Sequence, residues 1–396
     1  MRIGIDCRTI LNPNGGELAG VGHYTYYLVK NLLSIDKQND YVLFFDNNFL
    51  DFEQFKAYNV KIVKFPFYQY KKYLPIAYSQ MLISAFFARE RLDLLHAPAN
   101  VIPIFYRRPA VVTIHDLAIY KFPDFFPTNK ILKQSFATKV LVPNSINLAK
   151  KIIAVSQNTK NDIIDIFGTS ENKIEVIYEG VISHGKNCPH QVSFTSVKEK
   201  YNIGEKYLLF LGSIEPRKNI INLIKAFKNY KLLEKEKANE LQLILVGSKG
   251  WKNKEIFETI KEANQNLSAK DNYQPIRYLG YVSLPEKLSL IANAIAFVFP
   301  SFYEGFGLPV LEAMSMSIPV ITSKISSIPE ITGQDGALLI NPYKESEIQD
   351  AISQIISDEG LREQLAIKGH NRAQEFTWQK CAEKTLEIYY QIIKNK

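Results

Sequence analysis

A loop that carries two glutamates is the part of the sequence richest in residues able to do chemistry. Residues 296–314 read AFVFPSFYEGFGLPVLEAM, so an apolar strand pattern ends at Pro300 and is followed by Glu304 and Glu312 around a glycine turn. A helix is expected to begin near Pro309, because proline suits the first helical turn. The free N–H groups and the dipole of a helix start favour an anion. The loop is therefore predicted to bind an anionic ligand.

The two carboxylates of this loop would repel an anion unless they bind another kind of group. Hydroxyls are their natural partners, because each carboxylate can accept hydrogen bonds at both oxygens. Gly305 and Gly307 would let the backbone approach a phosphate or a sugar closely. A second interpretation stays open here, in which Glu312 only caps the helix and Glu304 is a solvated loop residue.

A second strand pattern leads into basic residues. In LLFLGSIEPRKNI, residues 208–220, the strand ends at Gly212, and Arg217 and Lys218 come just before the next helix. A diphosphate leaving group carries roughly two negative charges, which enzymes stabilise with Mg²⁺ or with Arg and Lys. The sequence has no Asp-x-Asp triplet and no carboxylate cluster typical of a Mg²⁺ site. Arg217 and Lys218 are predicted to take that role; the alternative is an ordinary solvent-facing pair.

In the first half, His115 and Asp116 stand at the end of the apolar run VVTI. A ring nitrogen of His115 is able to bond a substrate hydroxyl, while Asp116 orients the ring or positions the acceptor. A histidine satisfied by backbone is the alternative, and it is the better interpretation for His96 in LLHAP. The stretch NGGELAGVGHY, residues 14–24, matches neither GxGxxG nor GxxxxGK[ST]. It is interpreted as a mobile loop near the site, with Gly16 among its exposed N–H groups.

Strands and helices that alternate along the chain must position these residues. Short β-branched runs are separated by amphipathic stretches, which is typical of parallel sheets with crossover helices. The expected strands are 2–6, 41–45, 60–65, 92–96, 111–115, 151–155 and 174–178, then 207–211, 241–246, 277–279, 296–299 and 320–322. Helices are expected over 22–33 and 75–91, and the chain after about 345 is expected to be helical.

A polar, poorly patterned stretch near residues 183–203 interrupts this alternation and is interpreted as a linker. We therefore predict an α/β protein with two doubly wound domains, over 1–190 and 200–376, followed by a final helix over about 377–396. Two domains also suit a chain of 396 residues. Ligands of such sheets bind at the carboxyl ends of the strands, so a cleft between the domains is the expected site.

The composition narrows the class of protein. Apolar residues make up 46% and charged residues 22% of the chain, and the formal charge is +8. Basic residues are spread out without a nucleic-acid-reading motif, so no nucleic-acid partner is expected. The three cysteines, Cys7, Cys188 and Cys381, lie far apart, which indicates a reducing compartment. Without a signal peptide or a run of about 18 apolar residues, the chain is expected to be cytoplasmic.

These segments together resemble glycosyltransferase family 4, a group of retaining enzymes with the GT-B fold. The resemblance spans nearly the whole chain and rests first on the Glu-x7-Glu pattern of EGFGLPVLE. The other matching segments occur in the family's order and are GGELAGVGHY, IHD at 114–116, IIAVSQNTKNDI at 152–163, GSIEPRKN and YLGYVS at 278–283. A last helix that packs back on the first domain is also implied.

The resemblance implies a role for each matching residue. Glu304 would contact the hydroxyls of the donor sugar and Glu312 those of the ribose. The catalytic residues would be His115, which would face the transferred sugar, Arg217, Lys218 and Glu304. The donor-binding residues would be Gly16, Gly212, Arg217, Lys218, Tyr281, Val282, Glu304, Gly305, Phe306, Gly307, Leu308 and Glu312. The nucleobase would meet Tyr281 and Val282 mainly through backbone.

The family's mechanism needs no protein nucleophile, and neither a metal nor a cofactor is expected. IGIDCR, AGVGHYTYYL and TIHDLAIYKFP most resemble bacterial mannosyltransferases of polysaccharide and O-antigen assembly, which favours GDP-mannose as donor. Two alternatives stay open: a transferase that uses a UDP-sugar, and an inactive nucleotide-sugar-binding partner subunit. Intact Glu304, Glu312, Arg217 and Lys218 argue against the second. An epimerase and a phosphorylase fit less well, and no lysine is marked for pyridoxal phosphate.

The acceptor is expected to be a saccharide or a lipid-linked saccharide. Residues 64–91 mix aromatic residues with Lys and Arg around an amphipathic stretch. Such a segment is able to lie in a membrane interface, as a peripheral contact on the inner face of the cell membrane. The alternative is a helix of the first domain with an ordinary apolar core face.

Overall fold

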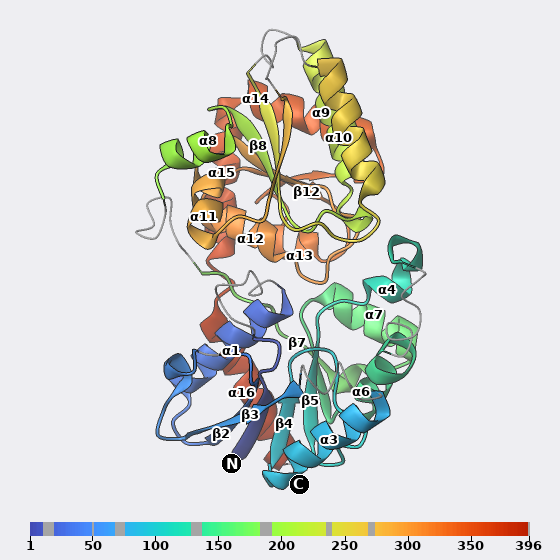
Figure 1. The fold of residues 1–396 in the computed structure, drawn as a ribbon, viewed down its shortest axis with the longest axis vertical. Coiled ribbons are helices and arrows are strands. Elements are labelled where there is room, and N and C mark those ends of the chain that lie inside the picture. Colours follow the sequence, from blue (N-terminus) through green and yellow to red (C-terminus); the bar gives the residue numbers. More distant parts are fainter. Residues whose placement is uncertain are drawn as a thin grey trace. The chain divides into compact units, whose positions relative to one another are not determined.

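The fold is described from a computed structural model that covers residues 1–10, 20–49, 51–67, 76–127, 137–182, 192–234, 240–267 and 274–394. The chain divides into two compact units (Figure 1). Unit 1 comprises residues 1–121, 128–180 and 376–396, and unit 2 comprises residues 122–127 and 181–375. Gly16, which the resemblance implied to be a donor-binding residue, lies outside the described residues.

Unit 1 is built on a parallel sheet with the strand order β3-β2-β1-β4-β5-β6-β7. Its strands are β1 (Arg2–Asp6), β2 (Asp40–Asp46), β3 (Val60–Phe65), β4 (Leu94–Ala97), β5 (Ala110–Ile114), β6 (Lys151–Ala154) and β7 (Ile174–Val176). Its helices are α1 (Val21–Ile35), α3 (Ile76–Arg89), α4 (Ala118–Lys121), α6 (Val142–Leu148), α7 (Gln157–Phe167) and α16 (Trp378–Lys394). The central strands are buried on both faces, which explains why their sequences are nearly continuously apolar.

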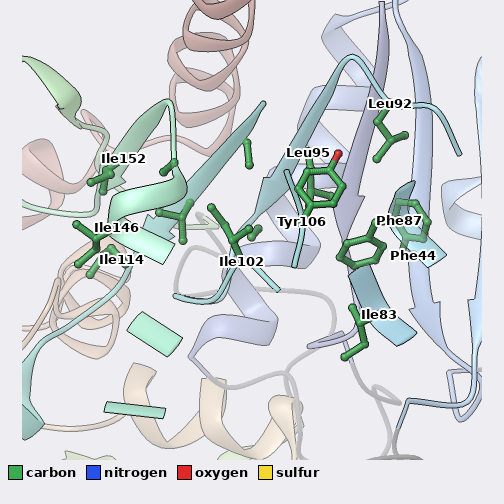
Figure 2. Packing of buried hydrophobic residues seen from close by; sticks show 14 of the residues in the cluster. Phe44, Ile83, Phe87, Leu92, Leu95, Ile102, Tyr106, Ile114, Ile146 and Ile152 are labelled. Atoms are coloured by element: carbon green, nitrogen blue, oxygen red, sulfur yellow. The ribbon is translucent and has the colours of Figure 1, made fainter. Parts of the chain in front are cut away.

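One face of this sheet is closed by an aromatic and aliphatic cluster (Figure 2). The ring centroids of Phe44 on β2 and Phe87 on α3 lie 4.5 Å apart, and Tyr106 packs edge-on against Phe87. Ile114, at the end of β5, belongs to the same cluster. Burial of so much apolar surface, worth about 25 cal/mol per Å², fixes the strand end that carries His115.

Unit 2 is a second parallel sheet with the strand order β10-β9-β8-β11-β12-β13. Its strands are β8 (Tyr207–Leu211), β9 (Gln242–Val246), β10 (Ile276–Gly280), β11 (Ala296–Phe299), β12 (Val320–Ser323) and β13 (Leu338–Ile340). Its helices are α8 (Phe194–Tyr201), α9 (Ile220–Leu233), α10 (Lys254–Leu267), α11 (Leu284–Ala292), α12 (Leu308–Ser315), α13 (Ile328–Thr332), α14 (Glu345–Ser357) and α15 (Glu359–Ala373). The doubly wound architecture predicted from the sequence is confirmed in both units.

Parts of the predicted organisation need correction. The stretch taken as linker contains helix α8, because Val197 is buried and Phe194 stacks on Tyr207. Strand β13 was missed; it is only three residues long, and two of the three are partly buried, which leaves too short a pattern to detect. Residues 122–127 were placed in the first domain but cluster with unit 2, where Phe125 stacks on Phe302.

The last helix belongs to unit 1, as the family resemblance implied. Helix α16 packs along α1 (Figure 1), and Trp378 stacks on Tyr27 at a centroid distance of 5.5 Å. Further along the helix, the Tyr389 hydroxyl lies 2.6 Å from Nδ1 of the buried His96. In the described part of the chain, no helix has both the length and the apolar character needed to cross a membrane.

Candidate active site

The strand order of unit 2 brings together the two loops that were predicted from the sequence to carry the reactive side chains. Strands β8 and β11 are hydrogen-bonded neighbours, and the chain leaves them toward opposite edges of the sheet. Arg217 and Lys218 follow β8, and Glu304 follows β11, so all three lie at the carboxyl end of this switch point. In open α/β sheets this is the position at which ligands bind.

Glu304 is the centre of this site and is not a solvated loop residue. It is 7% exposed, and its Oε1 accepts hydrogen bonds of 2.6 Å from both Lys218 Nζ and Ser301 Oγ. Its Oε2 lies 3.5 Å from a terminal nitrogen of Arg217. The glutamate and the lysine, far apart in sequence, thus form a buried ion pair with a serine hydroxyl as third partner.

The electrostatics of the ion pair follow from its burial. Burial by itself raises the pKa of Glu304, but the neighbouring charges of Lys218 and Arg217 outweigh it and hold that pKa below its ordinary value. Burial, and next the charge of Arg217, lower the pKa of Lys218. Each partner therefore depends on the other for its charge, and the pair behaves as one unit.

Arg217 is held by a carboxylate that the sequence analysis missed. Its Nε and Nη2 donate to Glu215 Oε1 at 3.2 and 3.0 Å, and its Nη1 donates to the Tyr303 carbonyl at 2.9 Å. Glu215 is 1% exposed, and its Oε2 has no hydrogen-bond partner among the described residues. A carboxylate two positions before an arginine at a strand end was the signal available in the sequence.

Two serines and a glycine fix the backbone of the Glu304 loop. Ser326 Oγ accepts from the Glu304 N–H and donates to its carbonyl, and Ser327 Oγ donates to the Phe306 carbonyl at 2.7 Å. Gly307 has φ 116°, and a Cβ there would lie 2.8 Å from Ile328. Because residues with a side chain rarely adopt that φ, glycine is required where the loop enters α12. The N–H groups from Gly305 to Leu308 are held in place at this helix start.

Glu312 lies within α12 and pairs with a residue of the preceding helix. Both of its oxygens accept from Lys287 Nζ of α11, at 2.7 and 2.9 Å, and its side chain is 23% exposed. The interpretation of Glu312 as a helix cap is therefore not supported. Lys287 had not been singled out. Nearby in the chain, Gly280 has φ 76°, Tyr281 is exposed and Val282 is buried.

Gly212 lies at the end of β8, as predicted. Its N–H donates to the Val246 carbonyl at 2.9 Å. Gly247 follows the neighbouring strand β9, and a Cβ added to it would lie 2.0 Å from the Gly212 carbonyl oxygen. The two strand-end loops therefore approach each other at van der Waals distance. This close approach needs a residue without a side chain at Gly247.

His115 belongs to unit 1, where it follows β5. Its Nε2 lies 2.7 Å from the Pro98 carbonyl and its Nδ1 lies 3.1 Å from Glu179 Oε1, so protein acceptors face both ring nitrogens. Asp116 accepts from the Ala118 N–H at the start of α4. His96 is fully buried, and its ring nitrogens bond the side-chain hydroxyls of Tyr389 and Thr113, not the backbone that was expected to satisfy it.

Within the ranges that the structure covers, no group of three or more His, Cys, Asp and Glu side chains is arranged to hold a metal ion.

Comparison with known proteins gives the family. A model for Glycosyltransferase Family 4 matches residues 18–183, and a model for Glycosyl transferases group 1 matches residues 193–372. O-antigen chain mannosyltransferase B of Escherichia coli is 32% identical over 94% of this chain and 96% of its own length. O-antigen chain mannosyltransferase RfbU of Salmonella typhimurium is 32% identical over 63% of this chain and 61% of its own length.

Solved structures share the fold at low sequence identity. A sucrose-phosphate synthase of Thermosynechococcus elongatus has a TM-score of 0.74 at 18% identity, with full coverage of both chains. HepE of Anabaena, in complex with UDP and glucose, has a TM-score of 0.70 at 18% identity, covering 98% of this chain and 99% of HepE. With its two matching family models and a full-length relative, the chain is a glycosyltransferase of the GT-B fold and belongs to glycosyltransferase family 4.

Proposed function

We propose that the chain is a retaining mannosyltransferase that moves mannose from GDP-mannose to a saccharide or lipid-linked acceptor in cell-surface polysaccharide synthesis. The observation that carries this proposal is the buried Glu304, held between Lys218 and Arg217 at the switch point of unit 2. The printed activity of the full-length Escherichia coli relative, an O-antigen chain mannosyltransferase, supports the choice of sugar.

The proposed chemistry assigns separate tasks to the two oxygens of Glu304. Oε1 is taken by Lys218 and Ser301, while Oε2 has a longer contact with Arg217 and is the oxygen proposed to accept from a hydroxyl of the donor sugar. The helix start at Gly305–Leu308 and the remaining protons of Lys218 would bind the diphosphate. Glu312, oriented by Lys287, would accept from the ribose hydroxyls.

The transfer step follows from this placement of charge. The bond between the anomeric carbon and the phosphate oxygen breaks, with positive charge developing on the sugar and negative charge on the departing diphosphate. The acceptor oxygen bonds to the anomeric carbon on the same face, and its proton passes to the phosphate oxygen that leaves. Lys218 and the loop N–H groups stabilise the leaving group, so the step uses no protein nucleophile and no bound metal.

The donor and the metal requirement are tested together with purified protein. GDP-mannose, UDP-glucose and UDP-N-acetylglucosamine are each incubated without acceptor, with and without EDTA, and release of nucleoside diphosphate is measured. We expect slow release from GDP-mannose that EDTA leaves unchanged, and none from Glu304→Gln protein. Release from a UDP-sugar alone would replace the donor. Loss of release in EDTA that Mg²⁺ restores would contradict the metal-free step.

A UDP-sugar donor is the second candidate, because HepE, which shares the fold, was solved with UDP and glucose. The donor panel above separates the two candidates directly. The family match and the ion pair of Glu304 are expected with either donor, so these two observations do not decide between GDP-mannose and a UDP-sugar.

We further propose a peripheral contact with the inner face of the cell membrane through α3. The helix buries Ile83 and Phe87 in the core of unit 1, yet Tyr78, Met81 and Leu82 are exposed on its other side. The helix therefore carries apolar side chains on two faces. Residues 68–75, which hold the preceding lysines, lie outside the described residues.

A further inference from the structure

The surroundings of His115 are unusual because both ring nitrogens face hydrogen-bond acceptors. Nε2 lies 2.7 Å from the carbonyl oxygen of Pro98, and Nδ1 lies 3.1 Å from Oε1 of Glu179. The side chains of His115 and Glu179 are 11% and 5% exposed. The ring is also fixed by Tyr24, which packs edge-on at a centroid distance of 4.7 Å.

The proton count follows from the partners. A carbonyl oxygen carries no proton, so the hydrogen bond to Pro98 places one on Nε2. If Nδ1 had none, its lone pair would face the carboxylate of Glu179, and two acceptors would meet at 3.1 Å. A second proton therefore lies between Nδ1 and Glu179. We assign this proton to Nδ1, so that Nδ1–H donates to Glu179 Oε1.

Three titratable groups packed around the pair, His96, Tyr24 and Cys381, are neutral near pH 7. Burial lowers the pKa of His96 to about 3, with a smaller contribution from His115. Burial likewise raises the pKa of Tyr24 and that of the Cys381 thiol well above their ordinary values. Asp116 is turned to the backbone of α4. The charge that meets Nδ1 across the 3.1 Å contact is thus that of Glu179.

The position of Glu179 is set by the last helix of the chain. The next residue, Gly180, lies so close to the start of α16 that a Cβ on it would come within 2.2 Å of the Trp378 backbone nitrogen. No side chain fits at Gly180, so the backbone after β7 is in close contact with the start of α16. The return of α16 to unit 1 thereby places the carboxylate beside His115.

We propose that Glu179 is the positioning residue of His115, holding the ring with both nitrogens protonated so that it acts as a donor and never as a base. The proposal rests on the proposed function and on the role beside the transferred sugar that the family resemblance implies for His115. In it, Nδ1–H stays bonded to Glu179, and Nε2–H keeps its proton but donates its hydrogen bond to a sugar oxygen in place of the Pro98 carbonyl oxygen. The acceptor's proton then has to leave by the donor phosphate.

The protonation state is tested first, independently of activity. Protein labelled with ¹⁵N-histidine is examined by NMR at pH 7.5, and His115→Gln protein assigns the His115 signals. Two protonated ring nitrogens are expected in the wild type, and an unprotonated Nδ1 in Glu179→Gln, because an amide leaves no charge opposite the ring. An unprotonated Nδ1 in the wild type, or an unchanged spectrum in Glu179→Gln, would overturn the proposal.

Kinetics with the donor found active then test the role. Glu179→Gln is expected to lower kcat by about tenfold to a hundredfold with little change in the donor KM. In a His115→Gln background the same change is expected to have no further effect. Glu175→Gln, which alters an exposed carboxylate of β7 paired with Lys151, serves as the matched control and should behave as wild type. Equal losses from Glu179→Gln in both backgrounds would show that it acts elsewhere.

The NMR and kinetic experiments test the role of Glu179 and the proposed function separately. A wild type that releases no nucleotide from any donor contradicts the proposed function, while the NMR result still decides the state of His115. Folding of each variant is checked by its thermal unfolding midpoint.

Discussion

Lys218 and Glu304 illustrate how far a buried charge depends on its partner. The two side chains are 8% and 9% exposed and meet at 2.6 Å, with the ring of Phe299 under the ammonium at 4.9 Å. Removing one partner leaves the other as an uncompensated charge in a poorly solvated place, which is costlier than removing both. The pair therefore contributes to stability as well as to the proposed chemistry.

This coupling gives a prediction for three variants. Glu304→Gln and Lys218→Met are each expected to lower the free energy of unfolding by about 3 kcal/mol, and the double variant by clearly less than their sum. Nucleotide release from the donor should be lost in all three. Urea unfolding provides the free energies. Additive losses would mean that the two side chains do not compensate each other's charge.

At the scale of elements, α3 combines a core face with an exposed apolar face. Ile83 and Phe87 are buried, whereas Tyr78 and Met81 are 59% and 49% exposed. Because aromatic and aliphatic side chains gain by leaving water, such a face favours a membrane interface, where nearby basic residues meet anionic lipid.

We expect the protein to sediment with vesicles that contain anionic phospholipid and only weakly with neutral vesicles. Replacing Tyr78, Met81 and Leu82 together by serine should weaken sedimentation at least several-fold, because apolar area drives insertion. Replacing Tyr58, an exposed aromatic residue between β2 and β3, by serine is the matched control. Unchanged sedimentation of the triple variant would end the proposal for α3.

At the scale of the whole molecule, the last helix is joined to the first unit by a buried polar network. His96 on β4 lies 2.6 Å from the Tyr389 hydroxyl of α16 and 2.8 Å from Thr113 Oγ1, and Tyr24 of α1 bonds the same threonine. The network needs a neutral His96, since burial lowers the pKa of that ring to about 3.

The sign of the pH effect follows from this lowered pKa. In the unfolded chain His96 protonates below about pH 6.5, whereas in the fold it resists protonation, so stability is full above that pH and falls as the solution is acidified. The loss should be about 1.4 kcal/mol per pH unit, or roughly 2 kcal/mol at pH 5. Urea unfolding of wild type and His96→Gln at pH 7.5 and pH 5 measures it. A variant with the wild-type pH dependence would contradict this assignment.

The pattern of the sequence was enough for the local features of both units. Alternating strand and helix signals predicted the doubly wound sheets, because apolar periodicity is a property of neighbouring residues. The same local logic put Arg217 and Lys218 after β8 and Glu304 after β11, at strand ends where ligands bind. Short or half-exposed elements such as β13 and α8 escaped it, since their apolar faces are small.

What the sequence determined by itself was therefore which residues stand at strand ends and helix starts. Which of them meet was decided by the tertiary structure. Lys218 and Glu304 are 86 positions apart, and His115 and Glu179 are 64 apart. Their contacts depend on strand order, which places β8 beside β11, and on the packing of α16 against Gly180. The physical reason is that an ion pair forms between groups made neighbours by the burial of distant apolar faces, and no local pattern encodes that choice.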